Sequence, residues 1–584
     1  MNVPSDRQPP RYRHRYANGC GAHLFLEALR RHGVEVLFGQ SIPSLLHLIA
    51  PEFGMRQIGY RTENAGAAMA DAYARISHKV AVVTAQNGPA ATLLVPGLAE
   101  ALKASVPIIA IVQDVHRDQR DRNAFQDIDQ VALYAGCAKW VRRVDDLGRI
   151  ADYVDMAFAA AAGGRPGPAV LLCPMDLFEE ALGAAGAPTV GPTRRANLGA
   201  YPLDRPVADP TSVAEAARLL AAAERPLVVA GGGVHLSAAA PALARLQESA
   251  ALPVATTSMG KGAVDEAHPL SAGVIGYFMG TRGMARHNRA LVETADVVLL
   301  VGTRTNQSGT DSWKLLPAGA RFIHIDVDPQ EIGRNYESLR LLGDAAATLD
   351  ALAAAMGKLD LAKRRAARKA LEARIAAGLK AHAEEAAPML ASAARPIRPE
   401  RLMAELERRL AADSIVVADA SYSSIWTLNY LRARRAGMRF LTPRGLAGLG
   451  WGLPFAIGAR VASPEAPVWC LVGDGGFGHV WSELETARRL GFSFVVMVLN
   501  NGILGYQAHA EDILFGDHTD VCSFAAVDHA AIARACGCYG ERIEDPAAIG
   551  PALDAAAARP GVTLLDIVTD PMAHPPITMY EAKR

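Results

Sequence analysis

The sequence predicts an α/β fold of three doubly wound, parallel-sheet domains, and three observations support this. Short apolar runs rich in Val, Ile and Leu alternate with helical patterns along most of the chain, which is typical of stacked β–α units. The pattern recurs in three segments, which are separated by a Gly/Ala/Pro-rich linker at about 181–210 and a charge-rich run at 358–385. The length of 584 residues is also too great for a single hydrophobic core.

The first domain is expected at 18–185, behind a basic tail at 1–17. The tail lacks the apolar centre of a secretion signal, so we expect a disordered segment. The strands of this domain are predicted from apolar runs at 36–38, 80–83, 108–112 and 169–172. An Ala-rich pattern at 65–75 predicts a helix between them.

The second domain is expected at 205–355 and the third at 395–572. Their strands are predicted at 226–230, 297–301, 322–326, 415–417, 468–472 and 494–499. Lys, Arg, Ala and Glu dominate the stretch between the two domains, which predicts a solvated connecting helix at 358–392 without a functional role. The third domain matches the first in size and pattern.

The composition argues against several classes of protein. The formal net charge is zero, so nothing suggests a nucleic-acid-binding protein or an acidic tail. The longest apolar runs have about ten residues, which is too short to span a bilayer. The seven cysteines are scattered, and the close pair Cys536 and Cys538 lacks the further ligands of a zinc site. We therefore expect reduced cysteines and a cytoplasmic protein without membrane partners.

Two motifs in the third domain predict a metal–diphosphate site. Gly473-Asp474-Gly475-Gly476 follows the strand at 468–472, and Asn500-Asn501 follows the strand at 494–499. The glycines let backbone N–H groups face an anion, while the carboxylate and amide offer oxygen ligands to Mg²⁺. Either motif alone would be an ordinary turn. The pair, at the carboxyl ends of two strands of one parallel sheet, is far more specific.

This pair resembles the diphosphate motif of thiamine-diphosphate-dependent enzymes of the acetolactate synthase, pyruvate oxidase and pyruvate decarboxylase superfamily. The resemblance covers about residues 20–570 and is closest to acetolactate synthase-like large subunits. It implies pyrimidine-binding, middle and diphosphate-binding domains, in that order. It also implies Asp474, Asn501 and the carbonyl of Ile503 as Mg²⁺ ligands, with Gly475, Gly476 and Leu504 as further cofactor-binding residues.

Glu63 is the predicted proton-relay carboxylate. It follows a predicted strand at 57–60 and opens the Ala-rich helix. By position alone it could simply be an acidic residue that favours a helix N-terminus. The superfamily places its relay glutamate before such a helix, followed by residues like Ala70-Asp71-Ala72-Tyr73-Ala74-Arg75. The resemblance therefore implies that Glu63 binds the cofactor's aminopyrimidine and is catalytic.

Four further segments resemble superfamily motifs or offer cofactor contacts. The segment 123–127 is similar to the Ala-Phe-Gln-Glu of acetolactate synthases, implying Phe125 and Gln126 at the reaction centre. At 85–92, Gln86 and Asn87 stand where the superfamily usually has a small residue, so their amides are expected to reach the substrate. The remaining expected contacts are the apolar wedge Leu449, the carbonyl of Ala447, and diphosphate contacts at 419–424 that include Ser421.

Departures from the superfamily limit the choice of reaction. The chain lacks the adjacent histidines of simple decarboxylases and has Gln507, a further catalytic candidate, in place of their glutamate. Ala510 stands where acetolactate synthases have the tryptophan that helps choose the acceptor. Gly302-Thr303-Arg304 matches the synthase middle domain, but the following residues differ, which leaves FAD possible but unsupported. A Rossmann-type NAD oxidoreductase would need a Gly-x-Gly-x-x-Gly motif together with a downstream acidic residue, and the sequence contains no such complete set.

The resemblance implies a thiamine-diphosphate- and Mg²⁺-dependent enzyme that acts on a 2-oxoacid or diketone. It would form an enamine and transfer it to an acceptor carbonyl, as an acetolactate-synthase-like carboligase. One alternative is a 2-oxoacid decarboxylase, or a C–C lyase or hydrolase of a cyclic 1,2-diketone. Another is a catalytically silent assembly or regulatory subunit, which the presence of Glu63, Asp474 and Asn501 disfavours. The resemblance further implies a homodimer or dimer of dimers with active sites at the subunit interface.

Overall fold

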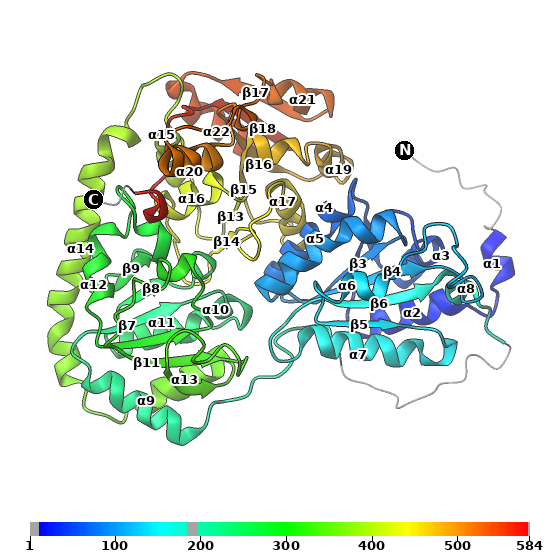
Figure 1. Cartoon of the computed structure of the whole chain (residues 1–584), viewed down its shortest axis with the longest axis horizontal. Coiled ribbons are helices and arrows are strands. Elements are labelled where there is room, and N and C mark those ends of the chain that lie inside the picture. Colours follow the sequence, from blue (N-terminus) through cyan, green and yellow to red (C-terminus); the bar gives the residue numbers. More distant parts are fainter. Residues whose placement is uncertain (1–10, 184–196, 582–584) are drawn as a thin grey trace. The chain divides into compact units, whose positions relative to one another are not determined.

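The computed structural model describes residues 11–183 and 197–581, and its strands form three six-stranded parallel sheets (Figure 1). The chain divides into two compact units. The first runs to Leu203 and the second begins at Asp204, with residues 75–77 grouped with the second. The first ten residues of the predicted basic tail, and much of the predicted linker, lie outside the described residues. The rest of the tail includes a short helix, α1 (Arg11–Arg15).

The first unit contains one sheet, in the strand order β2-β1-β3-β4-β6-β5. Its strands are β1 (Val36–Phe38), β2 (Arg56–Ile58), β3 (Ala81–Ala85), β4 (Ile108–Asp114), β5 (Trp140–Arg143) and β6 (Ala169–Pro174). Its helices after α1 are α2 (Gly21–Arg31), α3 (Ser44–Ile49), α4 (Glu63–Ser77), α5 (Pro89–Ala104), α6 (Gln130–Tyr134), α7 (Ile150–Ala162) and α8 (Met175–Glu179). The central strands β3, β4 and β6 are buried along their whole length, as expected for a parallel sheet covered on both faces.

The second unit begins with a sheet in the order β12-β11-β10-β7-β8-β9, a doubly wound arrangement that reverses between β7 and β10. Its strands are β7 (Pro226–Ala230), β8 (Val254–Thr256), β9 (Ser271–Val274), β10 (Val297–Val301), β11 (Arg321–Asp326) and β12 (Ser338–Leu342). Its helices are α9 (Pro210–Ala222), α10 (Gly233–Leu236), α11 (Ala240–Ser249), α12 (Arg289–Glu293) and α13 (Ala345–Met356).

The third sheet has the order β14-β13-β15-β16-β18-β17, which repeats the order of the first sheet. Its strands are β13 (Ile415–Ala418), β14 (Arg439–Leu441), β15 (Val468–Gly473), β16 (Phe494–Asn500), β17 (Tyr539–Ile543) and β18 (Val562–Val568). Its helices are α15 (Pro399–Glu407), α16 (Tyr422–Tyr430), α17 (Gly452–Ala462), α18 (Asp474–Gly478), α19 (Glu483–Arg489), α20 (Gly505–Phe515), α21 (His529–Ala535) and α22 (Ile549–Ala558). The expected fold class, three parallel-sheet α/β domains, is confirmed.

Helix α14 (Ala362–Leu390) joins the second and third sheets. We expected a solvated helix, but one side of it is buried. Ile375 and Ala386 pack into the cores beside the helix, and the guanidinium of Arg364 donates to the carbonyl of Ala223 at 2.9 Å. Gly378 lets the helix approach its neighbour closely, since a Cβ atom there would lie 2.4 Å from Oδ1 of Asn288, and a count of charges does not reveal this contact. Among the described residues, no helix is long and apolar enough to cross a bilayer.

Candidate active site

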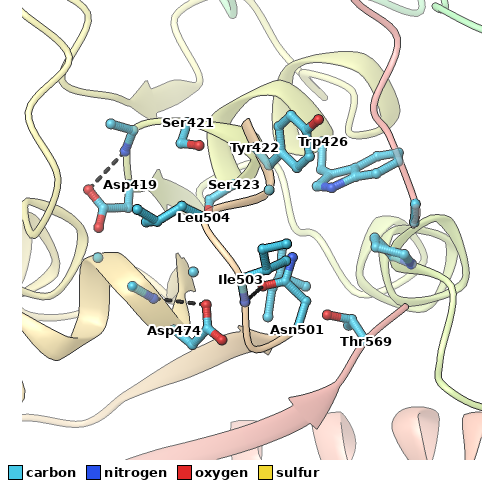
Figure 2. Close-up of a pocket in the computed structure, with 18 of the residues that line it drawn as sticks. Asp419, Ser421, Tyr422, Ser423, Trp426, Asp474, Asn501, Ile503, Leu504 and Thr569 are labelled. Atoms are coloured by element: carbon cyan, nitrogen blue, oxygen red, sulfur yellow. Dashed lines mark hydrogen bonds between the residues drawn. The ribbon is translucent and has the colours of Figure 1, made fainter. Parts of the chain in front are cut away.

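The carboxyl ends of β13, β15 and β16 border a pocket of about 540 Å³, counted with its open mouth (Figure 2). Gly473, the last residue of β15, pairs with Leu499 of β16, so the residues that follow both strands meet at one edge of the sheet. Eight residues predicted from the sequence to bind the metal or cofactor line this pocket: Ser421, Leu449, Asp474, Gly475, Gly476, Asn501, Ile503 and Leu504.

Asp474 opens α18 and is only 8% exposed. Its carboxylate accepts from the backbone N–H of Gly502 at 2.6 Å and from that of Gly475 at 2.8 Å. Burial raises the pKa of this carboxyl to about 6, although the two N–H groups act in the opposite direction. A buried carboxylate with a raised pKa is poised to bind a cation, because a divalent ion would favour its charged form again.

The amide of Asn501 and the carbonyl of Ile503 lie beside this carboxylate. One heavy atom of the Asn501 amide is 2.9 Å from the Ile503 carbonyl oxygen and 3.3 Å from Oδ1 of Asp474. With nitrogen at that position the amide donates to both oxygens. With Oδ1 there, three oxygens face one another, and the N–H of Ile503 donates to Oδ1 at 3.3 Å.

This spacing fits a magnesium ion. Neighbouring ligands in an octahedral Mg²⁺ shell are about 3 Å apart, since each lies about 2.1 Å from the ion at right angles to the next. The two distances from the Asn501 amide atom match the separation of neighbouring ligands in such a shell, and a rotation of the Asn501 amide converts a hydrogen-bonded cluster into an all-oxygen ligand set. Asn500, the first asparagine of the motif, is turned away, and its side chain donates to Asp566 and to the carbonyl of Val527.

Two glycines of α18 lie close to neighbouring side chains. A Cβ atom at Gly476 would lie 2.3 Å from Oδ2 of Asp419, and one at Gly475 would lie 3.0 Å from Leu504. Asp419 follows β13 and is fully buried. Its carboxylate accepts from the backbone N–H groups of Gly450 and Trp451, each at 3.0 Å, and of Ala420 at 2.8 Å. Burial raises its pKa, while these three donors lower it.

Asp419 thus fixes the turn that presents Leu449 to the pocket. Replacing Asp419 with Ala would leave three buried N–H groups without an acceptor, at about 1–3 kcal/mol each. We expect a loss of at least about 3 kcal/mol in the free energy of unfolding, measured by urea denaturation. Asp528, an exposed cap of α21, serves as the control, because its replacement with Asn should cost under about 1 kcal/mol. Equal losses in the two variants would contradict the role of Asp419.

The opposite wall of the pocket is formed by the start of α16. Ser421 has φ 62° and ψ −142°, a backbone conformation that residues other than glycine rarely adopt. The hydroxyl of the next residue, Tyr422, bridges Nδ1 of His509 at 2.7 Å and Nδ1 of His574 at 3.2 Å. Burial lowers the pKa of His509 to about 4, so this brace between α16 and α20 is uncharged at neutral pH. The strained start of α16 is therefore held from behind by α20.

In the first unit, Glu63 is the first residue of α4 and is only 7% exposed. The helix begins after a Thr62 cap, five residues beyond β2, so the predicted strand at 57–60 is shorter than expected. Within the described part of the chain, no ion pair or hydrogen bond to the Glu63 carboxylate is present. A buried carboxylate at a helix N-terminus without a protein partner fits a group that binds a polar ligand.

Three family models, each of one domain of thiamine pyrophosphate enzymes, match the chain. The N-terminal TPP binding domain matches residues 20–133, the central domain 213–352 and the C-terminal TPP binding domain 419–567. The chain is also 31% identical to a probable acetolactate synthase large subunit of Methanococcus aeolicus, over 94% of this chain and 92% of that protein. The chain belongs to the thiamine pyrophosphate enzyme family. It is a thiamine-pyrophosphate-dependent enzyme of acetolactate synthase-like type, as the sequence led us to expect.

Other relatives extend over the same length. The acetolactate synthase large subunit of Parasynechococcus marenigrum is 33% identical over 94% of this chain and 87% of that protein. The isozyme 2 large subunit of Escherichia coli is 29% identical over 94% of this chain and 95% of that protein. The similarity therefore includes all three sheets of this thiamine pyrophosphate enzyme and is not confined to the cofactor motifs.

The structure corrects one expectation for the first unit of this enzyme. We expected the amides of both Gln86 and Asn87 to reach the substrate, but Asn87 is only 5% exposed and its amide faces inward. It donates to the backbone carbonyls of Phe125 at 3.4 Å and Gln126 at 3.1 Å. A buried amide must satisfy its own hydrogen bonds, so Asn87 is unavailable to a ligand. Phe125 is 84% exposed and Gln126 is partly exposed, so both are accessible on this unit.

In the second unit, the predicted residues Gln507 and Ala447 lie outside the pocket lining, and some residues that line it were not predicted. Gln507 lies on the exposed face of α20, where its amide donates to Glu511 at 2.8 Å. Ala447 is exposed and has φ 63°, in the turn before Leu449. Thr569 and Asp570, which follow β18, line the pocket but were not predicted. Extending the strand-end argument to every strand of the third sheet would have identified them.

Proposed function

We propose that this enzyme uses thiamine diphosphate and Mg²⁺ to join a fragment of a 2-oxoacid or diketone to an acceptor carbonyl. The observation that supports the proposal most directly is the oxygen cluster of Asp474, Asn501 and Ile503, at the spacing of a magnesium shell. It occurs in a chain related over nearly its full length to proteins named acetolactate synthase. Addition to an acceptor carbonyl is the reaction class that those names describe.

We assign roles to the chain's own residues as follows. Asp474, Asn501 and the Ile503 carbonyl would hold Mg²⁺ against the diphosphate. Ser421, Gly475, Gly476 and Leu504 would contact the diphosphate, and Leu449 with the Ala447 carbonyl would contact the cofactor's rings. Glu63 would hold a proton at the aminopyrimidine, and Phe125, Gln126 and Gln507 would face the substrate. When bound, thiamine diphosphate supplies a nucleophilic carbon and an electron sink for carbon–carbon chemistry.

The subunit arrangement and the cellular location are part of the same proposal. We propose a homodimer or dimer of dimers in which Glu63 of one subunit serves the metal site of another. We propose a cytoplasmic location, which is supported by five buried cysteines that form no disulfide. FAD has no specific support, and the visible absorption spectrum of the purified protein tests for it directly.

Incubation with pyruvate, thiamine diphosphate and Mg²⁺ tests the proposed reaction. We expect acetolactate or acetoin as the product, because the chain lacks the histidine pair and the glutamate of protonating decarboxylases. Products are identified by chromatography and mass spectrometry, with a parallel screen of other 2-oxoacids and 1,2-diketones, with and without an aldehyde acceptor. Free acetaldehyde as the sole product, or cleavage of a cyclic diketone without ligation, would replace the carboligase with a lyase or hydrolase.

A further inference from the structure

The loop at 121–127 in the first unit has a strained backbone that something must hold in place. Asn123 has φ 56° and Gln126 has φ 61°, both in the left-handed region that glycine adopts more easily. Between them Phe125 is almost fully exposed, so its side chain does not anchor the loop. The conformation therefore depends on hydrogen bonds to the backbone of the loop.

Asn87 supplies these hydrogen bonds. Its Nδ2 donates to the carbonyls of both Phe125 and Gln126. The orientation of the Asn87 amide follows from its partners, because backbone carbonyls can only accept and the facing atom must be the nitrogen. The neighbouring Gly88 also abuts the loop, since a Cβ atom there would lie 2.7 Å from Cβ of Gln126. The turn at 86–88 and the loop thus fit together directly.

A chain of amides anchors Asn87 in the sheet. Because Oδ1 of Asn87 is left as an acceptor, it receives a hydrogen bond from Nε2 of Gln113 at 3.2 Å, at the end of β4. Gln130 in turn donates to the carbonyl of Gln113 and to Oδ1 of Asp114, both at 3.1 Å. Gln113 is 8% exposed and Gln130 is 1% exposed, so this series of hydrogen-bonded amides is shielded from water. Buried hydrogen-bond networks of this kind hold one geometry rigidly.

Gln86 contacts the side chain of Gln126 rather than its backbone. Nε2 of Gln86 donates to Oε1 of Gln126 at 2.8 Å. The acceptor end of the Gln126 amide is therefore occupied, and within the described part of the chain its NH₂ group donates to no other residue. An amide held in this way offers N–H donors, which favour an oxyanion such as a carboxylate over another donor.

We propose that Gln86 and Asn87 are positioning residues for substrate recognition. Asn87 holds the loop, and Gln86 turns the amide of Gln126 so that its N–H groups face the carboxylate of a 2-oxoacid. The proposal rests on the proposed function, which places Gln126 at the substrate. It adds that the substrate bound here is an anion, recognised by an amide whose direction a neighbouring residue sets.

The test reverses the orientation of the Gln126 amide. In a Gln86→Glu variant the carboxylate can only accept, so the Gln126 amide must rotate and turn Oε1 toward the substrate. We expect KM for the 2-oxoacid to rise about 10- to 100-fold, the range for losing a hydrogen bond to a charged group. Gln86→Met, which has a similar shape but no polar end, should raise KM less. Thiamine diphosphate affinity and the melting temperature should stay unchanged in both variants.

Gln119→Glu provides the matched control, because it adds the same charge at an exposed position of the same unit. Its KM should equal that of the wild type. Equal KM values in Gln86→Glu, Gln86→Met and the wild type would overturn the role of Gln86 while leaving the proposed function intact. Wild-type turnover of neutral diketones alone would instead overturn both the 2-oxoacid assignment and anion recognition.

Asn87 is tested without relying on turnover. Asn87→Leu removes both donated hydrogen bonds, so amide hydrogen exchange at residues 123–127 should accelerate at least about tenfold by mass spectrometry. Gln119→Glu should leave that exchange unchanged. Unchanged hydrogen exchange in a folded Asn87→Leu variant would show that Asn87 does not hold the loop, whatever the enzyme's substrate proves to be.

Discussion

Replacement of Glu63 with Gln should lower kcat by roughly 100- to 10,000-fold, the usual contribution of a positioned acid–base group. Glutamine keeps the shape and polarity of the side chain but cannot exchange a proton at the cofactor. The affinity for thiamine diphosphate and Mg²⁺ should change little, because glutamine can still hydrogen-bond the aminopyrimidine and the proposed metal ligands Asp474, Asn501 and Ile503 are unchanged. Steady-state turnover and calorimetric titration of the cofactor measure the two effects separately.

Glu27→Gln is a suitable control, because it makes the same change on an exposed position of the first unit. Its kcat should match the wild type. Glu63→Asp should retain part of the activity, since the carboxylate remains but is set back by one methylene group. An unchanged kcat in Glu63→Gln would remove Glu63 from the proton relay.

The proposed interface predicts complementation between two inactive variants. If Glu63 of one subunit serves Asp474 of another, a mixed dimer of Glu63→Gln and Asp474→Asn subunits has one intact site and one doubly altered site. Random reassembly of equal amounts should then restore about a quarter of the wild-type activity, since half the dimers are mixed and each has one active site of two. No restored activity after verified subunit exchange would place both residues in the same subunit.

The third sheet illustrates what sequence patterns can predict. Buried strands are read from runs of apolar residues, and the residues after such strands meet at one edge because parallel pairing aligns the strand ends. Asp474 and Asn501 were found in this way, and the pairing of Gly473 with Leu499 places them side by side. Thr569 follows the same rule after β18 and was missed because its residue type suggested no ligand.

Contacts between distant segments could not be predicted. Asn87 meets the loop at 125–126 and Asp419 meets the turn at 450–451, and nothing in the local sequence indicates either contact. Both depend on the backbone path of a loop, which periodicity does not specify. For the same reason the sequence suggests that the Asn87 amide could reach the substrate, whereas in the structure it donates to the carbonyls of Phe125 and Gln126.

Replacement of Asp474 with Asn should weaken the binding of thiamine diphosphate and Mg²⁺ at least about 100-fold, more than the usual cost of altering a residue behind a metal ligand. The variant loses the only charged member of the oxygen cluster, and an amide oxygen is a much weaker ligand for a hard cation. The rise in melting temperature on adding cofactor and metal reports the binding, since a ligand stabilises the state that binds it. Asp528→Asn should keep the full rise.

In the metal-free protein, the raised pKa of Asp474 predicts the direction in which stability changes with pH. Because the pKa of Asp474 is raised to about 6 by burial, its carboxyl binds a proton more tightly folded than unfolded. Its contribution to stability is therefore complete below about pH 4 and lost as the pH rises through 6, by on the order of 1–3 kcal/mol. Asp474→Asn has no such proton, so this part of the decline should disappear from its urea-denaturation profile between pH 4 and 8. Bound Mg²⁺ should suppress the same decline in the wild type, because the cation replaces the proton. If Mg²⁺ and cofactor leave the pH dependence of wild-type stability unchanged, Asp474 does not bind the metal.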